Sequence, residues 1–408
     1  MTELDVDFVR RQFPPLANGW IMLENAGGSY VPQSVIDRLG AYMRDLQIQP
    51  AWDFGPAAEA QRRIAAGRRL MAEMINAEPD EVMVGPSTTL NVYLLAQAIR
   101  HWFQPGDEIV VTDLDHEANN GAWRRLAEHG LVLREWRIDP ATGELDEAAL
   151  EALLGPRTRL VCFTHCSNII GSINDVASIA RKVHAVRGLV MVDGVAFAPH
   201  RAVDVKALDV DFYAVGLYKI FGPHQALLYG KRELFLRARG QNHYFIGEDN
   251  IPLKLLPGGV NHELTASLVG LADYFDAVYR HHFKAPENSF TRRVQRVYEL
   301  FQRHEEKLAN RVLDYLRSKP GVRIHGQGAA RGTRAPTISF TVAGKNSREL
   351  AEALNREKIA IGYGDFYAKR CIEALGVADQ EGVVRIGLAH YNRMDEVERT
   401  IAVLDRLL

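Results

Sequence analysis

Disulfides, membrane spans and a secretion signal are what this 408-residue sequence lacks. Its only cysteines are Cys162, Cys166 and Cys371, a low and odd number that provides no disulfide framework and is typical of a reducing compartment. No apolar run is long enough to cross a bilayer. The N-terminus, MTELDVDFVRRQF, has acidic residues where a signal peptide would be basic and then apolar. We therefore predict a cytoplasmic protein.

The sequence also lacks a large excess of positive or negative charge. The formal net charge of −2 gives no electrostatic reason to expect a nucleic acid or a membrane surface as partner. Cys162 and Cys166 lie on and just after the apolar run RLVCFTHC, where packing is the favoured role, and the further ligands that a metal site needs cannot be placed. With 47% hydrophobic and 25% charged residues, the chain has ordinary globular composition and can bury a large core. No metal is predicted.

Short apolar runs alternate with helical patterns between about residues 80 and 230. The segments EIVVTD at 108–113 and LVMVDG at 189–194 each contain an unbroken apolar run, as in strands that are buried on both faces. Strands that alternate with helices predict an α/β fold with a mostly parallel sheet, whose ligands bind at the carboxyl ends of the strands. The later helices and strands come in mixed order, which indicates a smaller α+β domain. We expect an arm at 1–20 that packs on the small domain, a large domain at 21–282 and the small domain at 283–408.

Lys219 lies in the middle of the segment DFYAVGLYKIFGPHQALLYGK, between two apolar runs. Gly216, Gly222 and Pro223 predict that it lies on a turn between two strands. Burial would favour its neutral amine, a nucleophile that condenses with carbonyl groups. Taken alone, the segment favours a plainer alternative, a lysine that reaches from a strand edge to water.

Other polar residues follow the predicted strands. Ser87 and Thr88 open a helix directly after a strand, where they form either an anion site or a simple helix cap. Asp193 either caps the following segment or faces a ligand. His116 and Asn168 follow two further strands, and each also suits an ordinary structural role.

Considered together, these groups match the needs of pyridoxal 5'-phosphate. Its phosphate needs amides and hydroxyls, its ring needs a stacking partner, its pyridine nitrogen needs a carboxylate and its aldehyde needs a lysine. The joint occurrence is far more specific than any single group, so we expect this cofactor.

From about Leu23 to its C-terminus, the sequence resembles the class V, fold-type I pyridoxal-phosphate enzymes. This group includes cysteine desulfurases, selenocysteine lyases and isopenicillin N epimerases. The motifs that carry the resemblance are DHEAN at 115–119, CSNIIG at 166–171, VDGVAFAPH at 192–200, LYKIFGPH at 217–224 and VVRIGLAHYN at 383–392.

The resemblance implies a role for one residue of each motif. His116 would stack on the cofactor ring, and Asn168 would contact the ring hydroxyl or the substrate. Asp193 would pair with the pyridinium, Lys219 would form the imine, and Arg385 would hold the substrate carboxylate through a bidentate pair.

The sequence departs from desulfurases where those enzymes carry a nucleophilic cysteine on a mobile loop. In the run IAIGYGDFYAKRC, Tyr367 stands about where that cysteine would be, and Gly362 replaces an arginine. Cys371 follows at what looks like a helix start, where packing is its favoured role.

Three further departures surround the cofactor. Tyr218 replaces the usual histidine next to the lysine, and Ala196 replaces a glutamine. Gly258 and Gly259 stand for the glycine–threonine pair that reaches the phosphate of a dimer partner. The resemblance thus implies a homodimer whose active site forms at the interface, with Gly259 at the cofactor.

We expect an enzyme that acts on an L-amino acid, with Lys219 as general base at the α-carbon. The favoured reaction is carbon–sulfur β-elimination without an enzyme persulfide. Candidates for proton transfer at the leaving group or the α-carbon, near the substrate, are Tyr218, Tyr363 and Tyr367. Transamination and epimerisation remain alternatives. So do a desulfurase that uses Cys371 and a binding protein that has kept the fold without turnover.

Overall fold

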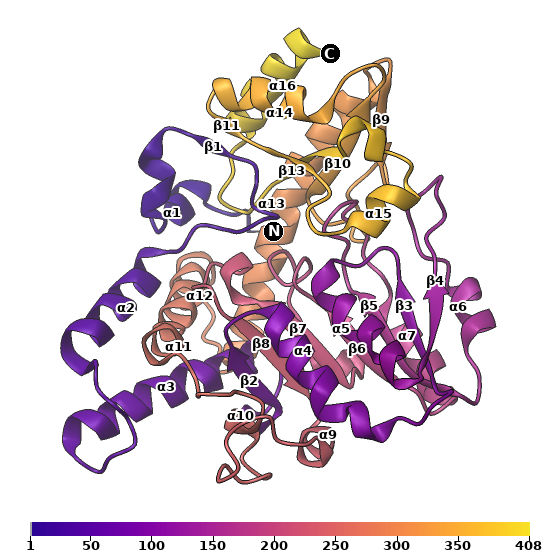
Figure 1. Ribbon diagram of the computed structural model, residues 1–408. Coiled ribbons are helices and arrows are strands. Elements are labelled where there is room, and N and C mark those ends of the chain that lie inside the picture. Colours follow the sequence, from indigo (N-terminus) through magenta and orange to yellow (C-terminus); the bar gives the residue numbers. More distant parts are fainter. Residues whose placement is uncertain (1) are drawn as a thin grey trace.

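The computed structural model describes residues 2–408 (Figure 1). Its largest sheet has seven strands, in the order β2-β8-β7-β6-β5-β3-β4. Only β8 runs antiparallel to its neighbours, so the predicted mostly parallel sheet is confirmed. The strands are β2 (Val82–Gly85), β3 (Glu108–Thr112), β4 (Val132–Trp136), β5 (Thr158–Thr164), β6 (Leu189–Asp193), β7 (Phe212–Gly216) and β8 (Ala226–Gly230).

Both faces of this sheet are buried, which explains the continuous apolar runs. In β3, Val110 packs into one core, whereas Ile109 and Val111 pack into the core on the opposite face. The helices up to residue 282 are α1 (Val6–Arg10), α2 (Gln33–Leu46), α3 (Gly55–Met74), α4 (Thr88–Ile99), α5 (Gly121–Arg124), α6 (Glu147–Leu153), α7 (Val176–Ala185), α8 (Val205–Leu208), α9 (Arg232–Arg237), α10 (Ile251–Lys254), α11 (His262–Ser267) and α12 (Val269–His282).

A second, antiparallel sheet has the order β12-β13-β10-β9 and lies with the C-terminal helices at the top of Figure 1. Its strands are β9 (Val322–His325), β10 (Thr337–Val342), β12 (Gly362–Gly364) and β13 (Val383–Gly387). The helices are α13 (Phe290–Arg317), α14 (Ser347–Arg356), α15 (Lys369–Ala374) and α16 (Met394–Leu407). The long helix α13 joins the two parts, because Val294 packs into a core of the large sheet and Leu313 into that of the small one.

The N-terminal segment reaches both parts of the molecule. The guanidinium of Arg10 donates to Glu396 on α16, whereas Phe13 packs into a core of the large sheet. The short strand β1 (Ile21–Met22) pairs in parallel with β11 (Ile359–Ala360). The domain boundaries predicted from the sequence stay a prediction.

Among the helical patterns between residues 80 and 230, the one at 118–130, ANNGAWRRLAEHG, predicts a longer helix than the structure contains. Residues 118–130 form only the short helix α5, with 3₁₀ turns before and after it. Asn120 is the cap residue that precedes α5, and its backbone is not helical, with φ −127° and ψ −53°. Its side chain donates to the carbonyl of Thr112 at 2.7 Å, a bond that competes with a continuous helix. No helix among residues 2–408 combines the length and apolar character that crossing a membrane requires.

Candidate active site

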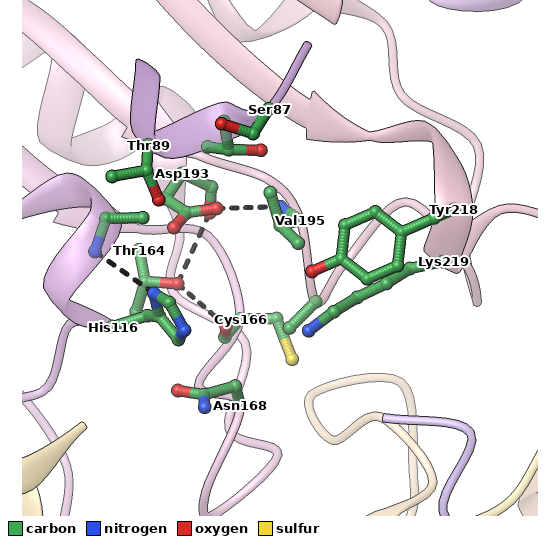
Figure 2. Close-up of a pocket in the computed structure, with 13 residues that line it drawn as sticks. Ser87, Thr89, His116, Thr164, Cys166, Asn168, Asp193, Val195, Tyr218 and Lys219 are labelled. Atoms are coloured by element: carbon green, nitrogen blue, oxygen red, sulfur yellow. Dashed lines mark hydrogen bonds between the residues drawn. The ribbon is translucent and has the colours of Figure 1, made fainter. Parts of the chain in front are cut away.

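One pocket lies at the carboxyl ends of the strands of the large sheet, where the topology predicts ligand binding (Figure 2). It contains about 500 Å³ of space, part of it open to solvent. Loops that follow β2, β3, β5, β6 and β7 contribute most of its walls. The residues that line it are Ser87, Thr88, Thr89, His116, Ala118, Thr164, Cys166, Asn168, Asp193, Val195, Ala196, Tyr218 and Lys219.

Lys219 ends a 3₁₀ turn, Leu217–Lys219, between β7 and β8, as the sequence predicts. Its side chain is buried, and Figure 2 shows the amine pointing into the pocket between Tyr218 and Cys166. Burial, assisted by the positive charge of Arg385, lowers the pKa of Lys219 to about 8, although Asp193 opposes this shift. A substantial fraction of the amine is therefore neutral near pH 8.

Asp193 is the last residue of β6 and is buried. Its Oδ1 accepts a hydrogen bond from the amide of Val195 at 2.8 Å. Burial raises the pKa of this carboxyl, and the nearby amine of Lys219 counters the shift. A cationic ring nitrogen beside Asp193 would favour the ionised carboxylate, since opposite charges attract strongly where water is excluded.

His116 presents a neutral aromatic ring to the pocket. Its Nδ1 accepts a hydrogen bond from the amide of Ala118 at 3.0 Å, which fixes the ring as the cap of a 3₁₀ turn. Burial, together with Lys219 and Arg385, lowers the pKa of the imidazole to about 3. The ring therefore stays uncharged at neutral pH and suits a stacking role.

The start of α4 forms the other end of the pocket. Ser87 caps this helix, because its Oγ accepts from the amide of Leu90 at 3.1 Å, so the plain capping role holds. The hydroxyl of Thr88, by contrast, is buried and has no hydrogen-bond partner within residues 2–408. An unpartnered hydroxyl beside the free amides of a helix N-terminus fits a bound phosphate.

Arg385 lies on β13 and is not among the residues that line the pocket, but it contacts one of them, Asn168. Its Nη1 donates to the backbone oxygen of Asn168 at 3.0 Å, and its Nη2 donates to Glu24. The ring of Phe366 stacks on the guanidinium, with Cζ 3.5 Å from the ring centroid. Asn168 in turn donates from Nδ2 to the backbone oxygen of Phe366 at 3.1 Å. Burial lowers the pKa of Arg385, which Glu24 opposes.

The structure does not place every predicted residue in the pocket. Tyr363 faces the core of the small sheet, and its hydroxyl accepts from Arg348 at 2.8 Å. Tyr367 is 75% exposed, with its ring tilted against His116 at 5.6 Å between centroids. Gly259 is exposed, with nothing near enough to touch an added methyl group.

Two neighbours of Arg385 escape prediction from the sequence. Glu24 directly precedes the Asn-Ala-Gly-Gly run, whose glycines indicate a close approach of the backbone. These glycines were the available signal that the segment lies near a site. Phe366 adjoins Tyr367, and nothing in the sequence distinguishes the roles of the two rings.

All three cysteines are buried. Cys371 is completely buried in a small core with Leu114 and Ile169, and burial raises the pKa of its thiol, which agrees with the predicted packing role. Cys166 lines the pocket, but burial raises the pKa of its thiol to about 12. Within residues 2–408, no group of histidine, cysteine and acidic side chains is arranged to hold a metal ion.

Comparisons with known proteins agree with this geometry. Residues 21–400 match the family model for aminotransferase class-V. The aminotransferase-like protein FGM3 of Gibberella zeae is 36% identical, covering 100% of this chain and 99% of its own length. The cysteine desulfurase-like protein ustD of Aspergillus flavus is 32% identical over 99% of this chain and 91% of its own length.

Solved structures show the same fold. The cysteine desulfurase CsdA of Escherichia coli superposes with a TM-score of 0.82 at 25% identity, over 98% of both chains. The cysteine desulfurase of Thermococcus onnurineus gives a TM-score of 0.84 at 25% identity, over 100% of this chain and 98% of the other. Because the family match spans nearly the whole chain and the pocket fits the cofactor, the protein belongs to the aminotransferase class-V family of pyridoxal-phosphate-dependent, fold-type I enzymes.

Proposed function

We propose that this enzyme cleaves a carbon–sulfur bond of an L-amino acid by β-elimination, without forming a persulfide on the protein. The observation that carries the proposal is the lack of an available thiolate. Cys162 and Cys371 are completely buried and do not line the pocket, and the buried Cys166 thiol has a pKa of about 12. Tyr367 lies beside His116, in the loop where desulfurases carry their cysteine.

Bound pyridoxal phosphate supplies an electron sink for the electrons released at the α-carbon. The neutral amine of Lys219, favoured by its pKa of about 8, is the base that removes the α-proton. With the cofactor bound, Asp193 would keep the ring nitrogen protonated, His116 would cover the ring, and Asn168 would contact the ring hydroxyl or the substrate. Arg385 binds the substrate carboxylate with its planar fork of donors.

Tyr218 is the proposed proton donor to the leaving sulfur. The Nζ of Lys219 lies 5.9 Å from the centroid of its ring, so both side chains reach the same end of the pocket. Burial, followed by the charge of Asp193, raises the pKa of the phenol, which therefore keeps its proton at neutral pH. The ring of His224 stacks on Tyr218 at 5.1 Å and restrains its orientation.

A homodimer forms part of the proposal. Among the pocket-lining residues, all within the described chain, Lys219 is the one cationic side chain, which leaves the dianionic phosphate short of charged donors. The exposed Gly259 loop of a second copy would supply further backbone amides.

The predicted substrate contact of Tyr367 rests on the position of its ring beside His116. No such contact supports Tyr363.

The experiment is to incubate the cofactor-loaded protein with S-alkyl cysteines and to measure pyruvate and free thiol. Elimination predicts equal amounts of both products. The matched variant Cys371→Ser should release product at an unchanged rate, because this thiol takes no part. Release of sulfide from cysteine that disappears in Cys371→Ser would favour persulfide chemistry, and absence of pyruvate and thiol would remove the lyase proposal.

A further inference from the structure

Glu24 is the charged partner of Arg385, the arginine proposed to bind the substrate carboxylate. It forms an isolated parallel bridge with Gly387, two residues beyond Arg385 on β13, and its Oε1 accepts from Nη2 of that arginine. The two side chains differ in accessibility. The side chain of Arg385 is 2% exposed, whereas that of Glu24 is 25% exposed and so borders solvent.

The surrounding backbone leaves room for this carboxylate. A Cβ added at Gly27 would lie 2.6 Å from Oε1 of Glu24, and one added at Gly362 would lie 3.0 Å from Oε2. Oε2 is nevertheless buried without a hydrogen-bond partner in the described chain, as is Nε of Arg385. The ion pair thus leaves one acceptor and one donor unsatisfied, which weakens it relative to a fully bonded pair.

The other contacts of Arg385 are less easily exchanged. One is the backbone oxygen of Asn168, which cannot leave without moving the loop after β5. Another is the ring of Phe366, which covers the flat face of the guanidinium rather than its edge. Glu24 is therefore the partner that an incoming carboxylate can replace, and the replacement leaves the guanidinium paired with one negative charge before and after.

We propose that Glu24 holds the place of the substrate carboxylate on Arg385 and is displaced when an amino acid binds, an inference that rests on the substrate-binding role proposed for Arg385. Glu24 thereby determines ligand specificity. A ligand must displace a carboxylate that the chain itself holds beside Arg385. Small inorganic anions that match the guanidinium less well than a carboxylate does are therefore excluded. A carboxylate that can use both Nε and Nη2 gains the bidentate contact that Glu24 lacks.

The test uses propionate, a carboxylate that has no amine and is not turned over, with the cofactor-loaded enzyme in isothermal titration calorimetry. Removing the competing charge in Glu24→Gln should lower the Kd for propionate about tenfold or more. Binding of propionamide, which lacks the charge, should not gain in the same way. Glu135→Gln, which removes a carboxylate paired with Arg124 away from the pocket, is the matched control and should leave the Kd unchanged.

The propionate titration can also contradict the inference. A higher or unchanged Kd in Glu24→Gln would show that Glu24 merely supports Arg385, and would overturn the inference. If that variant does not fold, Glu24→Asp shortens the reach by one methylene and should still tighten propionate binding. Arg385→Gln should abolish binding in either background. Because propionate undergoes no reaction, failure of this test leaves pyruvate release to be judged separately.

Discussion

At the scale of single residues, the pocket shifts the ionisation of its side chains in opposite directions. Burial disfavours whichever form is charged, so the pKa of Lys219 falls while that of Asp193 rises. Both shifts belong to a pocket without its cofactor, and a bound cationic ring would stabilise the carboxylate.

The depressed pKa of Lys219 predicts how its reactivity depends on pH. In the cofactor-free protein, the rate of labelling by an amine-directed reagent should rise about tenfold per pH unit at low pH and level off above about 8. Lys182, whose pKa is raised by Glu147, is the internal control and should still gain reactivity well above that pH. Mass spectrometry of the two peptides gives both profiles. Parallel profiles would contradict the shift.

Replacing Asp193 by asparagine keeps the shape of the side chain and removes its charge. We expect kcat to fall about a hundredfold or more, because the ring nitrogen loses its anionic partner. The cofactor-free variant should not be less stable to heat than the parent, since a buried carboxylate has been replaced by a neutral amide. Steady-state kinetics and thermal unfolding measure the two effects. A small loss of kcat would argue against pairing with the ring nitrogen.

At the scale of elements, the connection from β12 to α15 decides where the rings of Phe366 and Tyr367 lie relative to Arg385 and His116. Phe366 and Tyr367 have φ angles of 48° and 59°, in the left-handed region that side chains seldom adopt. The turn is held by hydrogen bonds from Asn168 to Phe366 and from the amide of Glu117 to the backbone oxygen of Tyr367 at 2.8 Å. These contacts compensate the local strain and hold the loop against the large sheet.

Tyr367→Gly tests this loop. Glycine adopts the same φ without strain, so the unfolding free energy should change by less than about 1 kcal/mol as relief of strain and added chain entropy offset each other. KM should rise more than kcat falls, because the ring beside His116 is lost. Lys358→Gly, at a φ of 60° on an exposed turn, is the control and should leave KM unchanged. An unchanged KM in Tyr367→Gly would remove this residue from the substrate site.

The contact between β13 and the segment after β1 gives a second prediction at this scale. A Cβ added at Gly387 would lie 2.6 Å from the amide nitrogen of Ala26, so Gly387→Ala should push apart the segments that carry Arg385 and Glu24. We expect a loss of about 1–3 kcal/mol in unfolding free energy and weaker substrate binding, with cofactor absorbance retained. Gly40→Ala, where a Cβ meets nothing on α2, should change neither quantity unfavourably. Denaturant titration and KM values provide the comparison.

At the scale of the whole molecule, large aromatic side chains project from two exposed loops. Trp52 and Phe54 precede α3, and Tyr244 and Phe245 lie between α9 and α10. Such exposed rings favour an interface. We expect sedimentation at twice the mass of the chain, and a shift toward monomer with weaker cofactor binding in Phe54→Glu. A monomeric parent protein with full cofactor affinity would contradict the proposed dimer.

The local pattern of the sequence was enough to predict the parallel sheet and most of the cofactor pocket. Asp193 ends an apolar strand, and Lys219, His116 and Asn168 each lie within four residues after one. Parallel strands bring their carboxyl ends to one edge, where these residues line the same pocket. The faces of β12 were not predictable in this way. Gly362 pairs with Arg385 while Tyr363 pairs with Val384, so alternation along the strand turns Tyr363 into the small core.

Residue identity and strand order thus determined the cofactor chemistry, because that chemistry follows from groups at the ends of neighbouring strands. Tertiary structure alone decided the substrate side. Glu24 and Arg385 are 361 residues apart and meet only because the chain after β1 lies against β13. Contacts of this kind depend on how two sheets dock, and no periodicity within either segment carries that information.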